Sequence, residues 1–204
     1  MIFVRYENWR SYLRAYPVTS LLLVINIVMF IIVSFDGGSR NPVALLKYGA
    51  ITDLPQFSGE TWRLFTAMFL HNGFEHLLFN SFALLVFVPP LERIMGSWKF
   101  AILYLLSGLL GNIIGLAYYE RMPEYTFLVG ASGAIYGAYG AYLYIALFQR
   151  HVIDDTSRKT LFTLLVLGIL FSFTPGVSLI AHVGGLLGGF FLYGLMIRLF
   201  KSRT

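Results

Sequence analysis

The chain has 204 residues, of which 57% are hydrophobic and 12% charged, with a formal net charge of +5. A soluble domain carries about 25% charged residues, so this composition indicates a polytopic membrane protein, and its length fits a single membrane domain over residues 1–204. The absence of cysteine excludes disulfides, thiolate metal ligands and a cysteine nucleophile.

The N-terminal segment, residues 1–17, is basic and aromatic, and no small-residue cleavage site follows it. We therefore expect this segment to be mature sequence rather than a signal peptide. The remaining basic residues lie mostly in loops and tails, which indicates that they orient the chain in a lipid bilayer rather than bind nucleic acid.

Six apolar segments follow, and a spanning helix needs about 20 such residues. They are Thr19–Phe35, His76–Val88, Phe100–Tyr118, Ser132–Phe148, Leu161–Phe173 and Leu179–Phe200. We expect the short second segment to begin near Phe74 and to continue to Leu91 despite Pro89 and Pro90. The short fifth segment is expected to be tilted or extended into the loop before it. The predicted fold is an all-α bundle of six transmembrane helices.

The first outer loop, residues 36–73, is long and mixes prolines, aromatic residues and apolar residues. A segment of this length without a span of its own is expected to lie partly embedded at the membrane interface, where aromatic side chains anchor it.

Charge asymmetry predicts the orientation, because cytoplasmic loops carry an excess of Lys and Arg. Six spans put both termini on one side, together with 11 basic residues: Arg5, Arg10, Arg14, Arg93, Lys99, Arg150, Arg158, Lys159, Arg198, Lys201 and Arg203. The other side holds 4, namely Arg40, Lys47, Arg63 and Arg121. We expect both termini, with residues 1–17, in the cytoplasm, and the protein in a bacterial inner membrane.

The fourth predicted helix opens on a serine among small residues. Ser132 lies between Gly130 and Gly133, and glycines recur after it every three or four residues. This spacing clears one helix face, so that a neighbouring backbone can approach closely. Ser132 also lies where backbone N–H groups have no intrahelical partner, which makes its hydroxyl a candidate nucleophile. The alternative is a packing helix whose serine bonds its own backbone.

Polar residues of three predicted helices arrive at a similar depth, below the outer surface. His76 and Asn80 lie in the first turns of the second helix, Ser132 opens the fourth, and His182 lies one turn into the sixth. His182 can take the Ser132 proton, while His76, Asn80 and the Ser132 amide can stabilise an oxyanion. Apart from Glu75 at the loop edge no acidic residue lies nearby, so we expect a dyad rather than a triad.

Each of these residues also has a structural interpretation. A buried histidine can be a hydrogen-bond partner only, and His76 with Asn80 can bridge helices. We expect His71 to be structural and to bond a loop carbonyl. Tyr136 lies one turn below Ser132, where it is either simple core or packs against His182 and fixes the orientation of that ring.

Several short motifs follow one another along the chain from about Trp62 to Gly189. They are Trp62-Arg63, His71-x4-His76-x3-Asn80, Glu92-Arg93-x2-Gly96, Gly130-x-Ser132-Gly133 and Ala181-His182-x2-Gly185. Together they resemble the rhomboid family of intramembrane serine proteases, whose basic form is a six-helix bundle.

The resemblance implies that Ser132 is the nucleophile and His182 the general base, with His76, Asn80 and the Ser132 amide as the oxyanion hole. It also implies that Tyr136 stacks on the base, that Gly130 and Gly133 support the serine, and that Trp62-Arg63 and Glu92-Arg93 are structural. Neither a metal nor another cofactor is expected, and the zinc-protease motif His-Glu-x-x-His is absent.

These features predict an endopeptidase that cleaves transmembrane proteins near the outer face of the membrane. Substrate is expected to pass between the second and fifth helices, with Phe173-Thr174-Pro175-Gly176 as a flexible cap. Two other classes stay open: a non-enzymatic membrane chaperone or dislocation factor, and a small transporter, although no internal symmetry between halves is visible. Covalent chemistry at Ser132 would discriminate between them.

Overall fold

The computed structural model describes residues 2–4, 6–123, 125, 127–174 and 176–200. The chain is mostly helical. Its α-helices are α1 (Trp9–Ala15), α2 (Pro17–Phe35), α3 (Pro42–Lys47), α4 (Arg63–Thr66), α5 (Phe74–Val86), α6 (Pro89–Met95), α7 (Ser97–Tyr119), α8 (Ser132–Phe148), α9 (Asp155–Phe171) and α10 (Leu179–Leu199). The 3-10 turns η1 (Pro55–Phe57) and η2 (Ala67–Phe69) flank α4. Strands β1 (Ile51–Thr52) and β2 (Phe127–Leu128) pair antiparallel, with Ile51 opposite Leu128.

Helices occupy all six segments for which the sequence predicts spans. Among the described residues, α2, α7 and α10 are long and apolar enough to cross a membrane, with mean hydropathies of 2.7, 2.0 and 1.7. A fourth candidate is the pair α5 and α6. Helices α8 and α9 have 17 residues each, and α9 begins at Asp155, so it does extend into the loop before it. The chain is therefore an integral membrane protein of the all-α class.

The second predicted span differs from the expectation of one helix that runs to Leu91. Helix α5 ends at Val86, and α6 starts anew at Pro89 after a bend of 42°. Proline has no N–H to donate to the preceding turn and its ring clashes there, whereas at the first position of a helix neither matters. Pro89 and Pro90 therefore begin a helix instead of continuing one.

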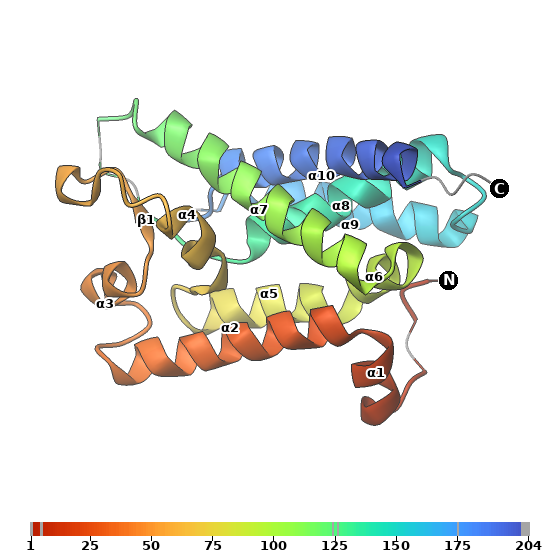
Figure 1. Ribbon diagram of the computed structural model, residues 1–204, viewed down its shortest axis with the longest axis horizontal. Coiled ribbons are helices and arrows are strands. Elements are labelled where there is room, and N and C mark those ends of the chain that lie inside the picture. Colours follow the sequence, from red (N-terminus) through yellow and green to blue (C-terminus); the bar gives the residue numbers. More distant parts are fainter. Residues whose placement is uncertain (1, 5, 124, 126, 175, 201–204) are drawn as a thin grey trace.

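The helices form two groups (Figure 1). Helices α2 and α5 lie side by side, and α7, α8 and α10 pack on one another beside them. Helix α1 and the C-terminal end of α10 lie at one end of the molecule, and α3, β1 and α4 lie at the opposite end. Helices α5, α8 and α10 all begin toward the end that carries β1 and α4. Their first turns are therefore close in depth, as the sequence predicts.

Glycines let α10 lie directly against α8. A Cβ atom built on Gly185 would collide with the carbonyl oxygen of Gly133, and one on Gly189 would collide with that of Gly137. Such close backbone approach requires small residues on both helices. The expected glycine faces thus hold the first turn of α8 against the first turns of α10.

Buried Glu92 of α6 caps the N-terminus of α2. Its carboxylate accepts hydrogen bonds from the backbone N–H of Val18 (3.0 Å) and Thr19 (2.9 Å) and from the hydroxyls of Thr19 and Ser97 (both 2.7 Å). A helix start has unpaired N–H donors and favours negative charge, so this contact stabilises the α2–α6 junction.

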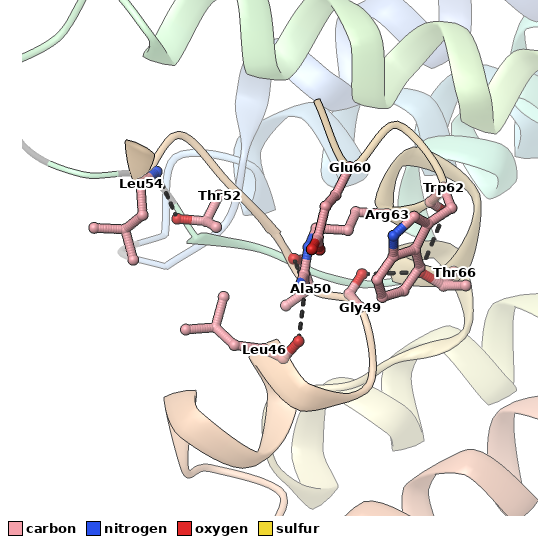
Figure 2. A network of polar contacts seen from close by, with 9 residues as sticks. All are labelled: Leu46, Gly49, Ala50, Thr52, Leu54, Glu60, Trp62, Arg63 and Thr66. Atoms are coloured by element: carbon pink, nitrogen blue, oxygen red, sulfur yellow. Dashed lines mark hydrogen bonds and ion pairs between the residues drawn. The ribbon is translucent and has the colours of Figure 1, made fainter. Parts of the chain in front are cut away.

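Arg63 ties the first outer loop together (Figure 2). Its guanidinium donates to the carbonyl oxygens of Leu46 (2.7 Å) and Ala50 (3.0 Å) and to Glu60 Oε2 (2.7 Å). The guanidinium also lies 4.6 Å from the centre of the Trp62 ring, and the Arg63 side chain is buried. The Arg63 guanidinium on α4 thereby joins that helix to α3 and to the residue before β1. This agrees with a structural role for Trp62-Arg63.

Candidate active site

Ser132 and His182 lie within hydrogen-bond distance of each other. Ser132 is the first residue of α8 and follows the cap residue Ala131. Its Oγ is 2.7 Å from Nε2 of His182, which lies in the first turn of α10. His182 is 4% exposed and Ser132 is partly exposed. The hydroxyl therefore faces the imidazole of another helix and does not simply cap its own backbone.

The other ring nitrogen of His182 contacts a residue that our sequence reasoning missed. Nδ1 lies 2.7 Å from Oγ of Ser172, the C-cap residue that follows α9. The Ser172 hydroxyl is buried, donates to the carbonyl oxygen of Gly168 (2.9 Å) and lies 2.9 Å from the hydroxyl of Tyr136. A serine at the end of an apolar helix is the only sequence signal here, and serines at such positions often bond only their own helix.

Tyr136 stacks flat on the His182 imidazole. The two ring centres are 4.1 Å apart and the ring planes differ by 11°. Four residues after Ser132, Tyr136 shares its face of α8 one turn further along. Of the two interpretations that the sequence left open, the structure has the one in which Tyr136 contacts the His182 ring.

Gly130 brings the His76 ring close to Ser132. Its φ of +128° is a conformation that L side chains rarely adopt, and a Cβ there would lie 2.7 Å from both Cε1 and Nε2 of His76 and 3.6 Å from Ser132 Oγ. The Gly130 N–H donates to the carbonyl oxygen of Ala67 (2.8 Å), which fixes this turn. Only glycine can therefore hold the loop before α8 against His76.

Gly133 has a different place in the packing. A Cβ on Gly133 would make only ordinary contacts, 3.7 Å or more from its neighbours, but its carbonyl oxygen lies against Gly185. Gly133 therefore lies at the α8–α10 contact, whereas Gly130 shapes the turn beside the serine.

Asn80 lies one turn after His76 in α5, so the two share a helix face. The Asn80 side chain is 6% exposed, and its Nδ2 has no hydrogen-bond partner among the described residues. Buried amide donors are normally paired, so this one is available to a group that enters the site.

His71 is 1% exposed and meets His76 edge-on, with ring centres 5.2 Å apart. The sequence predicts that His71 bonds a loop carbonyl. The Phe69 backbone has only a small, raising effect on the His71 pKa. Neither ring nitrogen of His71 makes a hydrogen bond of regular geometry within the described chain. Burial, with a smaller contribution from His76, lowers the His71 pKa to about 3.

One pair of aromatic rings bridges α5 and α9. Phe79 and Phe171 lie with ring centres 5.5 Å apart. Beyond this contact the last turns of α9 are largely exposed, with Leu170 at 61%. In the predicted cap Phe173–Gly176, Pro175 lies outside the described residues. Within the described part of the chain, no group of three or more His, Asp or Glu side chains is arranged to hold a metal ion.

Comparison with known proteins gives one consistent result. The family model described as Rhomboid domain matches residues 58–199. YdcA of Bacillus subtilis (strain 168), named as a rhomboid protease, is 38% identical over 200 residues, which cover 97% of each chain. Rhomboid protease GluP of the same organism is 36% identical over 174 residues, 85% of this chain but 33% of GluP. RHOMBOID-like protein 5 of Arabidopsis thaliana is 35% identical over 157 residues, 76% of this chain and 50% of that protein.

Proposed function

The chain belongs to the rhomboid family and is a rhomboid-type intramembrane serine protease, and from that premise we propose that Ser132 is its nucleophile and His182 its general base. The observation that carries the proposal is the 2.7 Å separation between Ser132 Oγ and His182 Nε2. Nucleophile and base must lie within such a distance for a proton to pass between them.

The reaction follows from this pair. Ser132 Oγ attacks the scissile carbonyl carbon as its proton passes to His182 Nε2, and the carbonyl oxygen becomes an oxyanion. Collapse of this intermediate breaks the C–N bond, and His182 returns the proton to the leaving amine. Water then attacks the acyl-enzyme ester, gives one proton to His182 and releases the acid, after which Ser132 regains its proton.

The oxyanion hole consists of the Ser132 backbone N–H, His76 and Asn80. At the start of α8 the Ser132 N–H has no partner within its own helix. Gly130 holds His76 beside the serine, and the Asn80 Nδ2 donor is unpaired. One such donor is typically worth about 3 kcal/mol in the transition state. Tyr136 supports the base through its stacked ring, and Gly130 and Gly133 support the serine.

The substrates are transmembrane proteins, and cleavage takes place near the outer face of the membrane. The whole of residues 1–204 acts as one membrane domain with six spans, formed by α2, the bent pair α5–α6, α7, α8, α9 and α10. Residues 1–17 and both termini lie in the cytoplasm, as the charge asymmetry favours. Residues 36–73 lie partly embedded at the outer interface, and the membrane is the plasma membrane of a bacterium.

Substrate reaches the site between α5 and α9. The Phe79–Phe171 contact is the barrier that must part there, and the buried residues within α9, Ser157 and Leu161, lie far from its last turns. Local opening of weakly packed elements on the μs–ms timescale is common at such gates.

A reconstituted cleavage assay tests the proposal. The protein in liposomes should cut a single-span model substrate, and mass spectrometry should place the new termini near the outer end of that span. Ser132→Ala and His182→Ala should each abolish cleavage while the circular dichroism spectrum and thermal midpoint stay close to those of the wild type. Full cleavage by folded Ser132→Ala protein would exclude Ser132 as the nucleophile.

A further inference from the structure

Ser172 provides a third group next to the two proposed catalytic residues. We propose that Ser172 is a positioning residue that holds His182 in the tautomer able to accept the Ser132 proton. This inference rests on the proposed Ser132–His182 pair and extends it. In place of the expected dyad, a chain of hydrogen bonds runs from the Ser132 hydroxyl on α8 through the His182 imidazole on α10 to the Ser172 hydroxyl at the end of α9.

The tautomer follows from counting protons at Ser172. A serine hydroxyl has one proton to donate and can accept two hydrogen bonds. Three groups lie within 2.9 Å of Ser172 Oγ: the carbonyl oxygen of Gly168, His182 Nδ1 and the Tyr136 hydroxyl. The carbonyl can only accept, so all three contacts are satisfied when Ser172 donates to Gly168 and accepts from the other two.

In that arrangement His182 carries its proton on Nδ1, and the lone pair of Nε2 points at Ser132. The opposite tautomer would require Ser172 to donate to Nδ1 and would sacrifice the side-chain bond to Gly168. It would also leave a proton on Nε2, where no base function is possible. The arrangement that makes more hydrogen bonds is therefore the one that catalysis needs.

Because Ser172 and His182 are buried, the tautomer of His182 depends on the Ser172 hydroxyl. Ser172 is 2% exposed and His182 is 4% exposed, so solvent does not readily substitute for the hydroxyl. Removal of the hydroxyl leaves the Nδ1–H of His182 without its acceptor, and the ring can then exchange tautomers or rotate. The Tyr136 ring restrains rotation by stacking but provides no acceptor for Nδ1–H.

The contact also makes orientation of the base depend on α9. Gly168 lies in the last turn of α9 and Ser172 is its C-cap residue, and this end of the helix meets α8 closely at Tyr136. A Cβ on Gly168 would lie 2.8 Å from the Tyr136 hydroxyl oxygen. When the end of α9 moves away, His182 loses its Nδ1 partner, so the base is oriented only while α9 is docked.

Steady-state kinetics of the full chain in liposomes provide the first test. Ser172→Ala should lower kcat by about 10- to 100-fold, the range typical when a hydrogen bond that orients a metal-bound histidine is removed, with KM changed less than about twofold. Ser172→Thr keeps the hydroxyl and should recover most of kcat. The matched control is Thr163→Ala, because the Thr163 hydroxyl makes the same type of bond, to Lys159, on the exposed face of α9.

Imidazole NMR provides the second test, which a merely structural role would not affect. The chain has 4 histidines, so ¹⁵N-labelled ring signals of His182 can be assigned by comparison with His182→Ala. We expect a protonated Nδ1 and an unprotonated Nε2 in the wild type, and a mixture of tautomers in Ser172→Ala. Should Ser172→Ala fail to fold, Ser172→Cys decides, because its thiol is a weak acceptor of similar size.

The outcomes separate this inference from the proposed function. Unchanged kcat and unchanged His182 signals in Ser172→Ala or Ser172→Cys would overturn the positioning role, even if Ser132→Ala and His182→Ala are inactive. Cleavage by Ser132→Ala would instead overturn the proposed nucleophile. Loss of kcat in Ser172→Ala with recovery in Ser172→Thr and a shifted tautomer would support the role.

Discussion

Ser132 Oγ lies 2.7 Å from His182 Nε2, although 50 residues separate them along the chain. The contact depends on backbone packing as much as on the two side chains, because α10 lies on α8 where Gly185 faces the Gly133 carbonyl and Gly189 faces that of Gly137. A serine and a histidine anywhere else in a bilayer would be two costly polar groups.

Packing at this contact predicts opposite outcomes for two adjacent glycines. Gly189→Ala would drive a Cβ into the Gly137 carbonyl oxygen. A Cβ on Gly188 would lie 3.1 Å from Leu110 Cδ1, the end of a flexible side chain, and at ordinary contact distances of 3.4 Å from Leu110 Cβ and 3.6 Å from Ser107 Cα. We expect Gly189→Ala to destabilise the fold by about 1–3 kcal/mol and to reduce cleavage. Gly188→Ala should leave both nearly unchanged. Thermal unfolding in detergent compares them, and equal midpoints for the two variants would contradict the packing account.

Substitution of Asn80 is expected to lower the rate of cleavage without lowering the stability of the fold. Its Nδ2 has no partner in the described chain, so Asn80→Leu removes no hydrogen bond that this donor makes in the resting fold. If Nδ2 stabilises the oxyanion, kcat should fall by about 100-fold or more. The control is Asn112→Leu, since Asn112 Nδ2 already donates to the Leu64 carbonyl oxygen at 2.8 Å.

The two asparagine variants are compared by kcat and thermal midpoint. Asn112→Leu should lower the midpoint and leave kcat of the folded protein close to that of the wild type. An Asn80→Leu protein with wild-type kcat would remove Asn80 from the oxyanion hole.

Burial of His71 is expected to make the fold less stable as the pH falls. Its pKa of about 3 lies below the usual 6.5, chiefly because burial disfavours the charged ring. A depressed histidine pKa means that the fold prefers the neutral form. The stabilisation is therefore fully present above pH 6.5 and is lost as pH falls from 6.5 toward 3.

Replacement of His71 by phenylalanine removes this proton uptake and keeps a ring beside His76. Between pH 6 and pH 4 the free energy of unfolding of the wild type should fall more steeply than that of His71→Phe, by up to about 1.4 kcal/mol per pH unit. Denaturant titrations at several pH values measure both slopes. Parallel slopes would mean that His71 takes up its proton equally in the folded and unfolded chain.

Hydropathy located α2, α5, α7, α8, α9 and α10, because lipid-facing segments must be long and apolar, but it did not indicate the short helices α1, α3 and α4. It could not predict the break before Pro89, where α5 ends and a separate helix, α6, begins at an angle of 42° to it. The motifs Trp62-Arg63 and Glu92-Arg93 indicated structural roles. Which groups Arg63 and Glu92 bind depends on segments distant in sequence, namely the chain before β1 and the start of α2.

Topology also predicted that Ser132, His182, His76 and Asn80 share one depth, because alternate helices begin on the same side of the membrane. It did not reveal Ser172, whose neighbours Gly168 and Thr174 gave no sign that its hydroxyl reaches His182 on another helix. The contact at 2.7 Å exists only because α9 ends against α8 and α10, and that placement is a property of the packed bundle.

Covalent labelling tests the central claim most directly. A fluorophosphonate applied to the folded protein in detergent should modify one residue, and peptide mapping should identify it as Ser132. His182→Ala should suppress the labelling, because the hydroxyl then has no base, while Thr163→Ala should label like the wild type. Modification at another serine, or full labelling of the His182→Ala protein, would contradict a nucleophile activated by His182.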